Sequence, residues 1–238
     1  MGTSDKKSSI QRMTAKTVVS LGLSTALVAV LTMAFQLYIP TTQGYFNLGD
    51  AAIFISALLL GPTIGMFAGG VGSATSDIVS GYPVYSPGTL VVKGIEGLLA
   101  GILFRKLRAS GSRKASLIIA GAILTLGAAT SIGIYTQFSI IGVVSWSLWA
   151  ILLTLFGLVL AYIAVRKGES SAAIIASAAA GLEMVAGYFL YENLLMVLGI
   201  LPGIFPIAEV FPNLAQVLIG AAIAVPTVDQ FNKLTRSK

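Results

Sequence analysis

Long apolar runs, separated by short polar segments, fill most of the chain. They lie at about residues 18–39, 51–60, 63–79, 88–104, 115–136, 143–165, 172–199 and 211–228. A helix that crosses a bilayer needs about 20 apolar residues, because it rises only about 1.5 Å per residue. The runs therefore predict an all-α, polytopic transmembrane bundle of about eight spans, forming one domain over residues 1–238.

Composition excludes several classes of function. Charged residues make up 10% of the chain, whereas a soluble domain has about a quarter. The chain contains no Cys and no His, which removes disulfides, the usual zinc and haem ligands, and an imidazole catalyst. It also lacks the G-x-x-x-x-G-K-[ST] phosphate loop of an ATPase. We therefore expect a protein that is not an enzyme, holds no cofactor or metal, and does not bind nucleic acid.

The distribution of positive charge orients the predicted spans. Fourteen of the 15 Lys and Arg residues lie before the first run or after the fourth, sixth and eighth runs. Because cytoplasmic loops carry the excess of Lys and Arg, this pattern predicts that both termini are cytoplasmic. The exception is Lys93, which lies inside the fourth run.

The second run, residues 51–60, is short for a bilayer span and ends at the Gly61-Pro62 turn signal. A helix of this length must begin deeper, tilt, or be shielded by neighbouring helices, and a re-entrant hairpin is the alternative. The third run contains Gly65, Gly69, Gly70 and Gly72. These glycines predict close packing, mainly against the first two spans.

Polar side chains gather toward the external ends of the spans. A charged group near the bilayer centre is costly, so such residues usually face the bundle interior and mark a ligand or ion path. With the polar and aromatic residues of the outer loops, they predict an outward-opening pocket for a planar polar solute. The candidate contacts are Asn47, Asp50, Asp77, Tyr85, Lys93, Glu96, Tyr188, Glu192 and Asn213.

Each candidate also has a structural interpretation. Lys93 and Glu96 lie three residues apart on one helix face and could pair with each other. Alternatively, Lys93 would contact an anionic or carbonyl group of the ligand, while Glu192 and Asn213 supply acceptors or an amide. Asp50 and Asp77 could cap helix ends in water, and aromatic residues at membrane interfaces are often anchors.

Small residues recur at helical spacing in the first run. Gly22, Ala26 and Ala29 form a strip that lets another helix approach closely. Packing inside the bundle and lateral docking of a partner subunit both account for it.

Several motifs resemble a known family. They are Gly44-Tyr-Phe-Asn-Leu-Gly-Asp50, Leu60-Gly-Pro62, Tyr82-Pro-Val-Tyr-Ser-Pro87 before Lys93, and Ala186-Gly-Tyr-Phe-Leu-Tyr-Glu192. Together they resemble the substrate-binding S components of energy-coupling factor (ECF) vitamin transporters, and most nearly the riboflavin or hydroxymethylpyrimidine branch. The resemblance covers about residues 16–108 and 172–229. It breaks off at about 112–168, which we interpret as a two-helix insertion.

The resemblance implies a six-helix core in the cell membrane that captures a water-soluble vitamin or precursor from outside, beneath loops that act as lids. It further implies a transmembrane coupling subunit and two ATPase subunits as partners. Gly22, Ala26 and Ala29 would then face the coupling subunit, and the whole S component would topple to deliver its ligand. Two rivals remain: an autonomous ion- or proton-coupled transporter that uses Asp77, Glu96 and Glu183, and an assembly subunit without a ligand.

Overall fold

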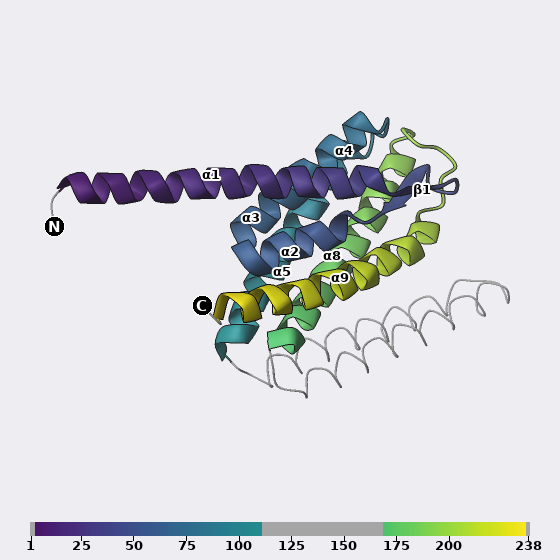
Figure 1. Ribbon diagram of the computed structural model, residues 1–238. Helices are drawn as coiled ribbons and strands as arrows, with labels where there is room; N and C mark the ends of the chain where they lie inside the picture. The colour runs from purple at the N-terminus through teal and green to yellow at the C-terminus, as the bar shows by residue number, and fades with distance from the viewer. Residues whose placement is uncertain (1–2, 111–168, 237–238) are drawn as a thin grey trace.

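The computed structural model describes residues 3–110 and 169–236, so the two predicted inserted helices lie outside the described residues. The described chain is mostly helical, as predicted (Figure 1). Its elements are α1 (Thr3–Ala34), β1 (Gln36–Ile39), β2 (Gly44–Asn47), α2 (Gly49–Leu60), α3 (Pro62–Phe67), η1 (Ala68–Gly72), α4 (Ser73–Val79), α5 (Ser86–Ser110), α8 (Glu169–Val197), η2 (Pro206–Glu209) and α9 (Val210–Arg236).

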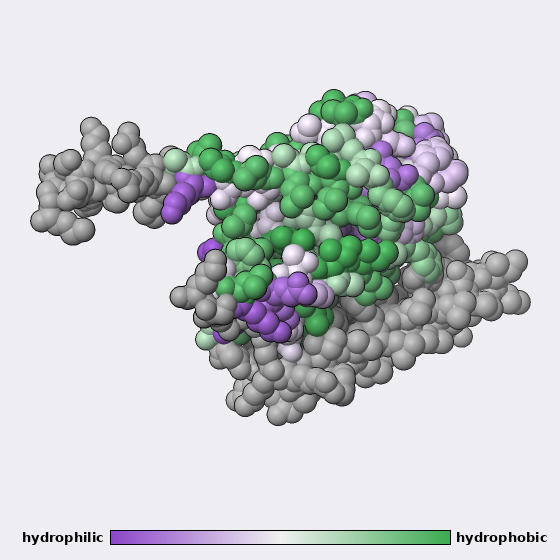
Figure 2. Space-filling model, in the orientation of Figure 1, coloured by the Kyte–Doolittle hydropathy of each residue, from purple (hydrophilic) through white to green (hydrophobic). Residues whose placement is uncertain are grey.

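Four described helices are long and apolar enough to cross a membrane. These spans are Ala15–Ala34, Ser86–Ala109, Ser170–Val197 and Pro206–Thr235. The short α2 and the continuous α3–η1–α4 segment pack among them. Figure 2 shows apolar side chains around the middle of the molecule and polar ones toward its ends. The protein is therefore a multi-pass membrane protein.

Both chain ends lie on the same side of the bundle, opposite the β1–β2 hairpin (Figure 1). That this side is the cytoplasmic one remains a prediction from the positive charges.

The hairpin is one element that the apolar pattern did not predict. The first run was expected to continue as helix to Ile39, but α1 ends at Ala34 and Gln36–Ile39 pairs antiparallel with Gly44–Asn47. Pro40 follows directly and cannot continue a helix, because it lacks the backbone N–H. The turn closes with Gln43 in a left-handed conformation, at φ 59°, and its N–H donates to Ile39 O at 2.9 Å.

The short helix α2 is shielded by its neighbours, which was one of the predicted solutions. Its 12 residues give it a length of about 18 Å, well below the roughly 30 Å of the hydrocarbon core. It packs against α1, α5 and α9, and nine of its residues are buried. Gly61, at φ 106°, then reverses the chain into α3. Because α2 is short, the volume beyond its N-terminus is filled by other parts of the chain.

The apolar core lies at the end of the bundle away from the hairpin. Phe54, Phe104, Ile175 and Val228 contribute to it from α2, α5, α8 and α9 respectively. At the same end, Arg105 donates a long hydrogen bond of 3.5 Å to Leu60 O. Apolar packing thus holds one end of the bundle together, and the buried polar residues gather at the other.

The glycines of the third run pack against α1 and α2, as the sequence predicted, and equally against α5. An added Cβ at Gly70 would lie 2.6 Å from Leu90 O, and one at Gly69 would overlap Lys93 O. Gly65 faces both Ala57 of α2 and Gly97 of α5, whereas Gly72 faces α1. This close approach fixes the height of α5, and therefore of Lys93, relative to α3 and η1.

Two neighbouring glycines of α5 test this contact. We expect Gly97→Ala to lower stability by about 1–3 kcal/mol, because its methyl group would collide with the backbone of Gly65. Gly94→Ala is the matched control, since the atoms nearest its added Cβ lie at 3.6–3.9 Å, an ordinary contact distance. The measurement is the midpoint of thermal unfolding in detergent. Equal midpoints for the two variants would contradict the proposed packing.

Candidate functional site

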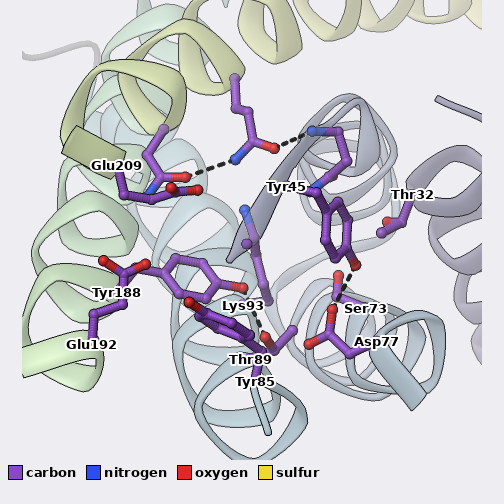
Figure 3. A pocket seen from close by; sticks show the side chains of 14 residues that line it. Thr32, Tyr45, Ser73, Asp77, Tyr85, Thr89, Lys93, Tyr188, Glu192 and Glu209 are labelled. Carbon is purple, nitrogen blue, oxygen red and sulfur yellow. Dashed lines mark hydrogen bonds between the residues drawn. The ribbon is translucent and has the colours of Figure 1, made fainter. Parts of the chain in front are cut away.

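A cavity lies at the hairpin end of the bundle, where α5, α8 and α9 meet the outer loops (Figure 3). Its empty volume, including the solvent-open space at its mouth, is about 410 Å³. The residues that line it are Thr32, Gly44, Tyr45, Asn47, Ser73, Asp77, Tyr85, Thr89, Lys93, Tyr188, Glu192, Glu209, Asn213 and Gln216.

Lys93 lies at the floor of the cavity and contacts two carboxylates. Its Nζ forms an ion pair with Asp50, in the first turn of α2, and lies 3.1 Å from Glu96 Oε2. All three side chains are at most 2% exposed. The ammonium also lies 5.7 Å from the centre of the Tyr188 ring, within the range of a cation–π contact. The positive charge of Lys93 is therefore already engaged by the protein.

Tyr45 connects the hairpin to α4 on one side of the cavity. Its hydroxyl donates a hydrogen bond of 2.5 Å to Asp77 Oδ1, and its ring lies 4.6 Å from that of Tyr82. Burial raises the pKa of Tyr45 above its ordinary value, and the Asp77 carboxylate raises it further. The hydroxyl consequently stays protonated and remains a donor to Asp77.

Hydrogen bonds join three outer segments into the roof of the cavity. The Thr42 hydroxyl donates to Glu209 Oε2, and the Tyr85 hydroxyl donates to Thr42 O. The N–H of Phe205 also donates to Thr41 O at 2.9 Å. Burial raises the pKa of Tyr85, with smaller contributions from the negative charges of Glu192 and Glu209. The hairpin turn, the loop before α5 and the segment before α9 thus act as one unit.

An amide pair from α9 completes the wall. Gln216 Oε1 accepts a hydrogen bond of 2.6 Å from Asn47 N, and Gln216 Nε2 donates to Asn213 Oδ1 at 3.0 Å. On the opposite wall, Tyr188 donates to Thr89 Oγ1 at 3.0 Å.

Several buried polar atoms of the lining have no hydrogen-bond partner within the described protein. They are Thr32 Oγ1, Ser73 Oγ, Asp77 Oδ2 and Glu192 Oε2. A buried polar group without a partner costs about 1–3 kcal/mol, so each calls for an explanation. All four belong to residues that line one cavity, whereas other atoms without a partner, such as Ser177 Oγ and Glu183 Oε2, belong to residues outside the lining.

Seven of the nine predicted site residues line this cavity. They are Asn47, Asp77, Tyr85, Lys93, Tyr188, Glu192 and Asn213. Asp50 and Glu96 do not line it; they lie against Lys93, so the structural pairing considered for Lys93 and Glu96 is present. Asp50 and Asp77 are both buried, which rules out capping in water.

The lining also includes residues that the sequence prediction omitted. Tyr45 could have been predicted because it is an aromatic residue of an outer loop, and Gln216 because it is a polar residue one turn from Asn213. Glu209 was harder to predict, since it is one acidic residue just before an apolar run. Thr32, Ser73 and Thr89 could not be predicted, because single hydroxyls are common inside membrane helices and commonly bond to their own backbone.

With this geometry established, comparison with known proteins identifies the family. The model of the ECF-type riboflavin transporter S component family matches residues 12–145, more than half of the chain. The chain belongs to this family. It is therefore an S component, a membrane-embedded transporter subunit and not an enzyme.

Two relatives are similar over shorter segments. A protein of Pyrococcus woesei named "uncharacterized protein in gap 3'region" is 42% identical over 100 residues, which are 42% of this chain and 67% of that protein. A UPF0397 protein of Streptococcus agalactiae serotype Ia is 30% identical over 109 residues, 44% of this chain and 59% of the relative. The chain thus spans about three-fifths to two-thirds of the length of these relatives.

Removal of the charge of Lys93 tests the ion cluster. We expect Lys93→Met to destabilise the protein by about 3–5 kcal/mol, because Asp50 and Glu96 would lose their buried counter-charge. The triple variant Lys93→Met, Asp50→Asn, Glu96→Gln should recover much of this loss, since it buries no net charge. Thermal unfolding in detergent measures both. A single variant as stable as the wild type, or a triple variant less stable than the single one, would contradict the cluster.

Proposed function

We propose that this S component captures a water-soluble, vitamin-like micronutrient from outside the cell and presents it to an ECF coupling subunit with two ATPases for uptake. The observation that carries the proposal is the buried cavity with unpartnered polar atoms beneath three linked outer segments. A membrane protein has no structural need for such a cavity, because each buried unpartnered group lowers stability.

Seven of the predicted contacts would touch the solute, and Asp50 and Glu96 would hold Lys93 in place. Tyr85 and Tyr188 offer ring faces, while Asn213, Asp77 and Glu192 offer polar atoms to a ligand that is apolar on its faces and polar at its edges.

Uptake into proteoliposomes tests the proposal against its rival. The purified chain should retain a small molecule that mass spectrometry identifies. Liposomes that contain the chain should accumulate this molecule only when an ECF coupling subunit and ATPases are reconstituted with it and ATP is supplied inside. An ion gradient should have no effect on its own. Accumulation driven by an ion or proton gradient without ATPases would instead establish an autonomous secondary transporter.

The small-residue strip on α1 is the proposed contact with the coupling subunit. Gly22 and Ala26 are exposed, and no atom lies within 4 Å of a Cβ built at Gly22. Ala29, the third residue, is half-buried beside α4, and its backbone carbonyl accepts a hydrogen bond from Ser76 at 3.1 Å. Gly22 and Ala26 therefore offer an open surface where a helix of a partner could approach closely.

Bulk introduced on this strip should uncouple transport from binding. Gly22→Trp is expected to reduce ATP-driven uptake at least tenfold, because the indole would keep a partner helix at a distance, and to leave the affinity for solute unchanged. Leu27→Trp is the matched control: it is exposed on the same helix but lies about 140° around the axis from Gly22. Uptake assays and pull-down of the coupling subunit measure the two effects. Equal uptake by the two variants would place the coupling surface elsewhere.

A further inference from the structure

The cavity lining contains more acidic than basic side chains. Lys93 is the single cationic residue that the described part of the chain contributes to the lining, against the three acidic residues Asp77, Glu192 and Glu209. Two further carboxylates, from Asp50 and Glu96, already contact the ammonium of Lys93 from behind. Among the described residues, Lys93 therefore forms its ion pairs with Asp50 and Glu96 and none with the three acidic residues of the lining.

Two of these acidic residues lie together at one side. Figure 3 shows the carboxyl group of Glu192 beside the ring of Tyr188, Glu209 on the same side but higher in the view, and Asp77 across the cavity. Glu192 is 99% buried, at 1% exposure, and its Oε2 has no hydrogen-bond partner within the described residues. Glu209 accepts one hydrogen bond, from Thr42. Glu192 is thus a buried, unpartnered carboxyl group that faces a cavity.

The chemistry of this side selects a class of ligand. An anion would add negative charge beside Glu192 and Glu209, and like charges at short range in a buried site repel strongly. A cation would offset the carboxylates, donate hydrogen bonds to their open oxygens, and lie against aromatic faces that attract positive charge. A neutral molecule could form the hydrogen bonds and the ring contacts, but it would not offset the carboxylates.

We propose that the solute is an organic cation, a planar nitrogen heterocycle with an amino group or a fixed positive charge, whose charged end lies between Glu192 and Glu209. Its ring would lie against Tyr85 and Tyr188. This inference rests on the proposed function, since it assumes that the cavity binds the transported solute. It differs from a neutral flavin, the ligand class named by the matching family.

A series of probes with one ring and three charges tests the inference. The probes are 1-methylnicotinamide, nicotinamide and nicotinate, which carry positive, zero and negative charge on the same ring. Isothermal titration calorimetry of the purified chain in detergent should show the cation binding about tenfold or more tightly than the neutral amide, with nicotinate weakest. Affinity for nicotinamide equal to or greater than that for the cation would overturn the proposal.

Variants that each remove one carboxyl group show which residue determines the preference for the cation. Glu192→Gln keeps the shape of the side chain and is expected to weaken binding of the cation about tenfold and binding of nicotinamide by much less, so that the preference for the cation falls. Glu183→Gln is the matched control, because it removes an acidic group from the same helix, α8, outside the cavity lining. A preference for the cation that survives in both Glu192→Gln and Glu209→Gln would overturn the assignment of these two residues.

Riboflavin separates failure of this inference from failure of the proposed function. Tight riboflavin binding that Glu192→Gln does not change would overturn the cationic ligand and leave solute capture standing. If the chain binds none of the four probes and retains no small molecule through purification, the proposed function fails, and the charge inference fails with it.

Discussion

A single buried ammonium organises the hairpin end of this bundle. Lys93 contacts Asp50 from α2 and Glu96 from its own helix, with all three side chains almost fully buried. An unpaired charge at such a site is expensive, so the pairing constrains how α2 and α5 can pack. Because Asp50 lies in the first turn of α2, the ion pair also sets where that helix begins. The glycines of η1 then bring the backbone of α5 to the same height.

The cavity follows from this placement. Since α2 begins only at the level of Lys93 and is about 18 Å long, the space beyond it is covered by the hairpin and by the segments before α5 and α9. Hydrogen bonds from Thr42 to Glu209, Tyr85 to Thr42 and Tyr45 to Asp77 join these segments to one another and to α4. Under the proposed function, a solute that entered through this roof would have to separate hydrogen-bonded segments, so entry would require movement of the whole roof rather than of one loop.

The sequence predicted those features that depend on local chemistry. Apolar runs show where helices lie, and the cost of polar groups in a membrane singled out Lys93, Asp77, Glu192 and Asn213. For Asp50 and Glu96, the sequence could not distinguish contact with a ligand from a structural role. The spacing of Lys93 and Glu96, for example, is compatible with both. The hairpin was missed because residues 36–39 continue the apolar run of α1. Its pairing depends on residues 44–47, which lie beyond the turn.

The range matched by the family and several residues of the cavity lining lie in different parts of the chain. The matched range, residues 12–145, contains the hairpin, α2, α5 and Lys93, but Glu192, Glu209 and Asn213 lie outside it. The match therefore covers the part that builds the floor and one wall of the cavity, and the acidic side belongs to α8, η2 and α9. Function is determined by the groups at a site rather than by the fold that carries them. The proposed preference for a cation therefore depends on residues of α8 and η2 that lie outside the range matched by the family.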